Sequence, residues 1–132
     1  MSLTSDIREF HEKFGIDYAG PPRKLDTELL QFRVNFMKEE LIEYIESATM
    51  ADQLDALVDL TYIVLGTAHL QGFPFQEAWD RVHAANMQKV KGQSERSDKF
   101  DVIKPEGWTP PDLTDLVGEQ MELFNDNSTR RS

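Results

Sequence analysis

Apolar residues recur along the chain at helical spacing, and Gly and Pro residues separate the segments that carry this pattern. The spacing predicts helices over residues 4–14, 26–48, 51–70 and 74–90, with a short fifth helix over 113–124. Ser5 is the predicted N-cap of the first helix, and Pro74 is expected in the first turn of the fourth. No segment alternates with the period of two that a half-buried strand requires. We therefore predict an all-α fold, a four- to five-helix bundle assembled from antiparallel helix hairpins.

Two of the predicted helices are apolar on more than one face. The stripe of the second helix is Leu30, Val34, Met37, Leu41, Ile45 and Ala48, and that of the third is Leu54, Val58, Thr61, Leu65 and Ala68. Leu29, Phe32 and Phe36 give the second helix a further apolar face, and the third is apolar almost all round after Asp59. Such helices must be buried on several sides. We therefore predict a homo-oligomer, a dimer or a tetramer.

Composition narrows the classes of function that fit. The 132 residues fit one domain, residues 1–132, with an irregular C-terminal region from about residue 91. A net charge of −10 argues against binding to a nucleic-acid polymer. The absence of Cys excludes thiolate catalysis and cysteine-bound metals, and it fits a reducing cytoplasm. We expect a cytoplasmic protein with no signal peptide and no membrane partner, because no apolar run is long enough.

Acidic residues are concentrated in the middle of the chain. Nine acids and no Lys or Arg lie between Glu39 and Asp80, and seven of the nine fall on the second and third predicted helices. These helices are joined by a very short connection, so they should pack antiparallel. Counting from the turn, Glu40 lies level with Asp59 and Glu43 lies level with Asp55. We therefore expect four carboxylates to converge in one layer of the hairpin.

Carboxylates that lie this close repel one another unless a cation separates them. Oxygen ligands, with no Cys and no nearby pair of His, favour Mg²⁺, or Mn²⁺, over Zn²⁺. The sequence thus predicts a magnesium site formed by Glu40, Glu43, Asp55 and Asp59. The alternative is an acidic, solvated helix face that holds no metal.

Two acidic motifs and two later segments together resemble a known family. The motifs are EELIE at 39–43 and DALVD at 55–59, followed by VHAANMQKV and DVIKPEGWTPPDL. The pattern is similar to that of the MazG-like nucleoside triphosphate pyrophosphohydrolases, in the branch that resembles phosphoribosyl-ATP pyrophosphohydrolase, over about residues 27–113. The family pattern is EExxE followed by ExxD. This chain departs from it at Ala56, where the family has Glu, and Asp55 is the nearest acid.

The resemblance implies Mg²⁺-dependent hydrolysis of a nucleoside triphosphate between its α and β phosphates, which gives the monophosphate and pyrophosphate. Glu39 or Glu43 would then accept the proton of the attacking water. Asn86 and Lys89, and Lys104 in the later basic region, are the candidate contacts to the sugar and phosphates. Trp108 covers a base or pins the C-terminal tail.

Two alternatives to this function stay open at this stage. Phosphoribosyl-ATP is an alternative substrate on the same fold. A non-catalytic acidic helical oligomerisation module, which Ala56 favours, is the alternative to an enzyme.

Overall fold

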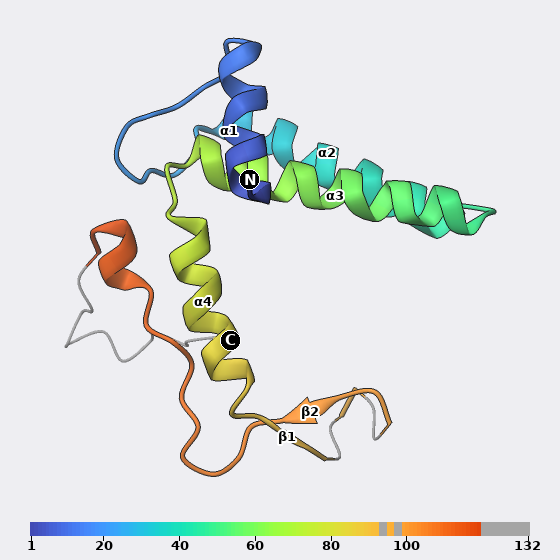
Figure 1. The fold of residues 1–132 in the computed structure, drawn as a ribbon, viewed down its shortest axis with the longest axis vertical. Helices are drawn as coiled ribbons and strands as arrows, with labels where there is room; N and C mark the ends of the chain where they lie inside the picture. The colour runs from blue at the N-terminus through green and yellow to red at the C-terminus, as the bar shows by residue number, and fades with distance from the viewer. Residues whose placement is uncertain (93–94, 97–98, 120–132) are drawn as a thin grey trace. The chain divides into compact units, whose positions relative to one another are not determined.

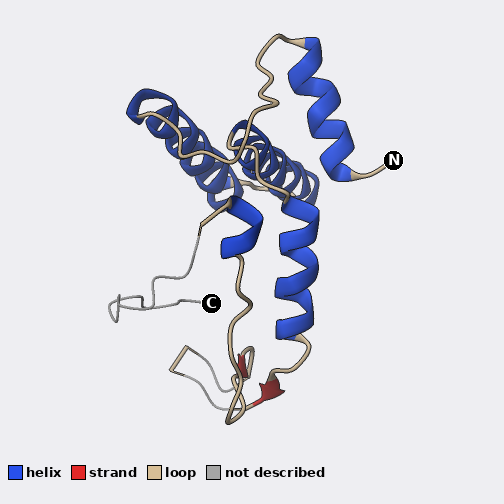
Figure 2. Ribbon diagram, turned by 90° about the vertical axis from the view of Figure 1, so that its left-hand side faces the viewer, coloured by secondary structure: helices blue, strands red, loops and turns tan. Residues whose placement is uncertain are grey.

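The structure is a computed structural model, and it describes residues 1–92, 95–96 and 99–119. Its elements are α1 (Leu3–Lys13), α2 (Thr27–Glu46), α3 (Met50–Leu70), α4 (Phe75–Asn86), β1 (Val90–Lys91), β2 (Val102–Ile103) and a single 3₁₀ turn, η1 (Thr114–Val117). Nearly all the regular structure is helical, so the predicted all-α class is confirmed (Figure 2). The chain forms two compact units, the first over residues 1–75 and the second from Gln76 onwards. The single domain over 1–132 stays a prediction.

The first unit is built on an antiparallel hairpin of α2 and α3, which lie side by side (Figure 1). The Asp26 carboxylate caps α2 by accepting a hydrogen bond from the Leu29 N–H at 2.8 Å. The Thr49 hydroxyl caps α3 in the same way, accepting from the Asp52 N–H at 3.1 Å. Only three residues separate the end of α2 from the start of α3. This short connection fixes which residues of the two helices lie at the same level.

Helix α1 packs against the C-terminal half of α3. Its Ile7 and His11 side chains are both only 2% exposed, and the Phe10 ring meets the Tyr62 ring edge to face at 5.3 Å. The helices approach closely at Gly66, where a Cβ would lie 2.6 Å from an Arg33 guanidinium nitrogen and 2.9 Å from His11 Nε2. Glycine is therefore required at this position to leave room for both side chains.

Much of the predicted apolar stripe lies on the surface of the described chain. Leu41 and Ile45 of α2 are 49% and 70% exposed, and Leu54 and Val58 of α3 are 65% and 54% exposed. The buried residues of α2 are both polar, Arg33 and Glu40. The helical periodicity was predicted correctly, but the described residues leave much of the stripe exposed, and only its end at Leu65 and Ala68 is buried.

Several predicted bounds and elements were wrong. The N-cap of α1 is Ser2, not Ser5, because the Ser5 side chain instead closes a reciprocal capping box with Ser2. Helix α4 ends at Asn86 rather than near Val90, where the chain turns into a two-stranded antiparallel sheet that we did not expect. Only one 3₁₀ turn forms within 113–119 of the predicted last helix, and residues 120–124 lie outside the described residues.

The second unit contains α4, the small sheet and η1. Arg81 of α4 binds the Asp115 carboxylate with two hydrogen bonds, of 2.7 and 3.0 Å, and donates another to the Asp112 carbonyl at 3.0 Å. The Trp108 indole N–H donates to the Ala85 carbonyl at 2.7 Å. These contacts hold the loop that follows β2 against α4.

Across the described residues, no helix has both the length and the apolar character needed to cross a lipid bilayer.

Candidate metal centre and active site

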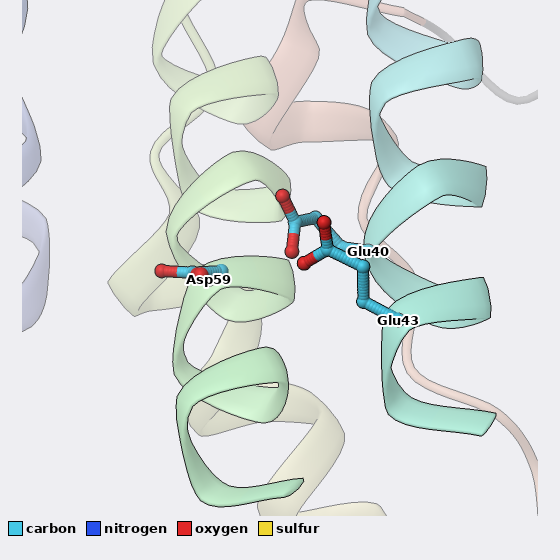
Figure 3. A group of neighbouring side chains, drawn as sticks. All are labelled: Glu40, Glu43 and Asp59. Carbon is cyan, nitrogen blue, oxygen red and sulfur yellow. The ribbon is translucent and has the colours of Figure 1, made fainter. Parts of the chain in front are cut away.

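Three carboxylates meet between α2 and α3. Glu40 and Glu43, one helical turn apart on α2, extend into the space between the helices, and Asp59 comes from α3 (Figure 3). Each residue offers a carboxylate oxygen, and these oxygens all lie within 4.8 Å of one another. The structure thus brings together three of the four residues that the short hairpin connection predicts.

Glu40 has an unusual environment for a carboxylate. Its side chain is 9% exposed, and its Oε2 atom is buried with no hydrogen-bond partner among the described residues. Burial, followed by hydrogen bonding to Glu43 and the negative charges of Glu43, Asp59 and Asp55, raises the pKa of Glu40 to about 7. A buried oxygen without a partner costs free energy, and a bound water or cation at this position would remove that cost.

The Asp59 carboxylate, like that of Glu40, lies close to other negative charges. Its pKa is raised, first by burial and then by the negative charges of Asp55 and Glu43. Two carboxylates from different helices therefore resist ionisation for the same two reasons, desolvation and like-charge repulsion. A cation at the cluster would remove both penalties, because it replaces the lost hydration and compensates the charge.

The three residues fit a hard divalent cation. The cluster contains only carboxylate oxygens, which suits Mg²⁺ or Mn²⁺ better than a metal that prefers nitrogen or sulfur. Three carboxylates would leave coordination positions for waters and for phosphate oxygens, the usual environment of Mg²⁺. Glu40, with its unpartnered Oε2, is the residue for which a cation would make the largest difference.

The other predicted acidic site residues lie outside this group of three. Asp55 is exposed and its oxygens are not part of the close set, although its charge contributes to the raised pKa of both Glu40 and Asp59. Ala56, at the position of the family Glu, is 3% exposed, so the buried position beside Asp55 holds a methyl group. Glu39 is exposed on α2. The roles of Asp55 and Glu39 stay predictions.

The candidate substrate contacts all lie in the second unit. Asn86 is the exposed last residue of α4. The ammonium groups of Lys89 and Lys104 lie over the Trp108 ring, at 5.1 and 5.2 Å from its centroid. Sequence reasoning left the role of Trp108 open and did not connect it with the two lysines. In the sequence, the hairpin is marked only by two short β-prone pairs, Val90–Lys91 before Gly92 and Val102–Ile103 after it. Two pairs of this length are too weak a signal to predict a hairpin.

The comparison with protein families agrees with this geometry. The sequence profile for phosphoribosyl-ATP pyrophosphohydrolase matches residues 7–86, which is more than half of the chain and includes the three clustered carboxylates. A search of curated proteins finds no match. Members of the matched family hydrolyse phosphoric anhydrides. The chain therefore belongs to the phosphoribosyl-ATP pyrophosphohydrolase family, within the MazG-like all-α superfamily, and is a nucleotide pyrophosphohydrolase.

Proposed function

We propose that the protein is a Mg²⁺-dependent enzyme that hydrolyses a nucleoside triphosphate between its α and β phosphates, releasing the monophosphate and pyrophosphate. The observation that carries this proposal is the group of oxygens from Glu40, Glu43 and Asp59 within 4.8 Å of one another, in a chain of a pyrophosphohydrolase family. A triphosphate carries several negative charges, so an acidic cluster of this kind can bind it only together with cations.

Glu40, Glu43 and Asp59 would hold the metal, with Asp55 as the adjacent fourth carboxylate. Bound Mg²⁺ supplies charge compensation for the phosphates and orientation for the attacking water. Glu43 or Glu39, both exposed, accepts the water proton. The hydroxyl then adds to phosphorus, the bridging P–O bond breaks, and pyrophosphate leaves with the bonding electrons. The carboxylate finally returns the proton to solvent.

Phosphoribosyl-ATP is the second candidate substrate. The family match over residues 7–86 favours it, because it is the substrate in the name of that family. It contains the same triphosphate chain, so the acidic cluster would act on either substrate in the same way. Asn86, Lys89 and Lys104 are the residues that we assign to substrate binding, in the second unit.

The exposed apolar face supports a homo-oligomer, a dimer or a tetramer. Nine large apolar side chains of α2 and α3 are at least 46% exposed: Leu30, Phe32, Leu41, Ile42, Ile45, Met50, Leu54, Leu57 and Val58. An apolar surface of this kind on one hairpin is normally covered by another chain. Sedimentation equilibrium at micromolar concentration should give a multiple of the 15.2 kDa chain mass. An active species at 15.2 kDa would exclude the oligomer.

The reaction is tested by measuring pyrophosphate release from phosphoribosyl-ATP and from a panel of nucleoside triphosphates, each with Mg²⁺ and with EDTA. We expect turnover of at least one triphosphate that stops in EDTA. Turnover of phosphoribosyl-ATP alone would replace the first substrate with the second. Absence of turnover with every substrate in the presence of Mg²⁺ would overturn the proposed function.

A further inference from the structure

A single arginine ties the two helices of the α2–α3 hairpin together. Arg33 of α2 donates a hydrogen bond from Nε to the Thr67 hydroxyl at 3.0 Å and another from Nη2 to the Ile63 carbonyl at 2.9 Å, and both acceptors belong to α3. Within the part of the chain that the structure describes, no other hydrogen bond and no ion pair joins α2 to α3. Apolar packing has no preferred direction, whereas a hydrogen bond does. Arg33 is therefore the directional contact of this interface.

Arg33 obeys the same register of the hairpin as the carboxylate cluster. About two helical turns back from Glu40 along α2 lies Arg33, and about two turns forward from Asp59 along α3 lies Thr67. The levels that bring Glu40 beside Asp59 therefore also bring Arg33 beside Thr67. The cluster lies between this contact and the short connection from α2 to α3, so the hairpin is fixed on both sides of the cluster.

Arg33 and Glu40 also point to the same side of α2. A separation of seven residues is nearly two full turns, so the two side chains lie within about 20° of each other around the helix axis. They are the two buried residues of this helix, at 6% and 9% exposed. A rotation of α2 that moved Glu40 out of the interface would also break the hydrogen bonds of Arg33. These bonds therefore fix the rotation of α2 as well as its position along α3.

The Arg33 guanidinium is buried at a cost in stability. No carboxylate forms an ion pair with it among the residues that the structure describes. The space for it is provided by Gly66, where a Cβ would lie 2.6 Å from Arg33 Nη2, and a glycine inside a helix weakens that helix. An apolar side chain of similar size in place of a buried charge is often neutral or stabilising. Stability alone therefore does not account for an arginine at this position.

We propose that Arg33 is a positioning residue for the metal centre, which holds α2 in the rotation and register at which Glu40 and Glu43 face Asp59. Arg33 acts through these carboxylates and does not itself bind the metal. Ligands that are already ordered when the cation arrives bind it more tightly, because less conformational freedom is lost on binding. The inference rests on the metal centre of the proposed function.

Arg33→Met tests this role, because Met removes both hydrogen bonds but keeps a long side chain. Mn²⁺ is titrated into the full-length protein without substrate, and the free ion is measured by electron paramagnetic resonance. We expect Mn²⁺ binding to weaken roughly tenfold, within the range for groups that orient metal ligands. The urea midpoint in EDTA should be unchanged or higher. The Thr67 hydroxyl keeps its bond to the Ile63 carbonyl, at 2.8 Å, and no charge is left without a partner.

The matched control is Arg23→Met. Arg23 Nε also donates to a carbonyl of α3, that of Leu70, at 2.9 Å, but Arg23 precedes α2 and does not join the two helices. The same substitution therefore removes the same kind of bond to the same helix. We expect unchanged Mn²⁺ affinity in this variant. An equal loss in Arg23→Met would overturn the proposal, and so would a lower urea midpoint of Arg33→Met with unchanged Mn²⁺ affinity, which is the result expected of a structural residue.

Thr67→Val gives a second test that leaves Arg33 in place. It removes one of the two acceptors, so it should weaken Mn²⁺ binding by less than Arg33→Met does. In the Arg33→Met background it should have no further effect, because the bond is already absent. An equal loss in both backgrounds would overturn the proposal. Unchanged Mn²⁺ affinity in Thr67→Val would overturn it even if Arg33→Met does not fold.

Turnover measured against Mg²⁺ concentration on the same samples separates this inference from the proposed function. In Arg33→Met the Mg²⁺ concentration for half-maximal turnover should rise by about the same factor as the Mn²⁺ dissociation constant. Turnover with an unchanged Mg²⁺ dependence would overturn the role of Arg33 alone. Mn²⁺ binding that depends on Arg33, without turnover of any substrate, would overturn the proposed function and leave the positioning role in place.

Discussion

Each of the two units places like charges close together with no opposite charge beside them among the described residues, but the environments of the two groups differ. In the first unit, Glu40, Glu43 and Asp59 meet between two packed helices, and Glu40 is 9% exposed. In the second, Lys89 and Lys104 flank a short hairpin, where Lys104 is exposed and Lys89 is half-buried. Burial adds desolvation to the repulsion between like charges, whereas solvent screens the repulsion of charges that it reaches. The acidic cluster should therefore affect both stability and catalysis, and the lysine pair should affect ligand binding only.

The largest expected effect is on turnover in the first unit. Glu40→Gln, Glu43→Gln and Asp59→Asn should each lower kcat by roughly 100-fold or more, because each removes a charged ligand from the metal centre. Circular dichroism should show unchanged helix content. Glu46→Gln, which removes an exposed acid from the same helix outside the cluster, is the control and should keep its activity. Full turnover in all three cluster variants would place the chemistry elsewhere.

A smaller effect on turnover is expected from substitution of Asp55. Its charge raises the pKa of Glu40, but its oxygens lie outside the group formed by Glu40, Glu43 and Asp59. Asp55→Asn should lower kcat/KM about tenfold, within the range seen when a group that supports a metal ligand is removed. The double variant Asp55→Asn, Ala56→Glu places the family's Glu at position 56. It tests whether a carboxylate at position 56 can take over the role of Asp55. Unchanged activity in Asp55→Asn would remove Asp55 from the site.

The smallest expected effect is on the stability of the metal-free protein. The folded-state pKa of Glu40, about 7, lies above its usual value of 4.5, so the folded state retains a proton that the unfolded state releases. Its stabilising contribution is present below pH 4.5 and is lost as the pH rises through 7. In EDTA at pH 8, Glu40→Gln should therefore raise the free energy of unfolding by about 1–2 kcal/mol.

Urea denaturation at pH 5 and pH 8 measures this difference, which should shrink at the lower pH. The double variant of Lys89 and Lys104 to Gln should change the free energy of unfolding by less than about 0.5 kcal/mol at either pH. A stability change in the lysine variants equal to that of Glu40→Gln would remove the contrast between the two units.

The bounds of α2 and α3 could be predicted closely because the residues that cap these helices are next to them in the sequence. Asp26 and Thr49 supply the capping oxygens, and the observed bounds of α2 and α3 differ by at most two residues from those that the pattern predicts. The end of α4 and the small sheet could not be predicted. Two-residue strands carry no periodicity, and their pairing joins residues more than ten positions apart.

The sequence by itself determined the all-α class, the family, and the meeting of Glu40, Glu43 and Asp59, because helical spacing and a three-residue connection fix the level of side chains in a hairpin. Only the tertiary structure decided which carboxylate is buried, that its Oε2 has no partner among the described residues, and that two lysines lie over the Trp108 ring. The burial of an atom and its hydrogen-bond partners depend on every element packed around it. A local sequence pattern therefore cannot predict them.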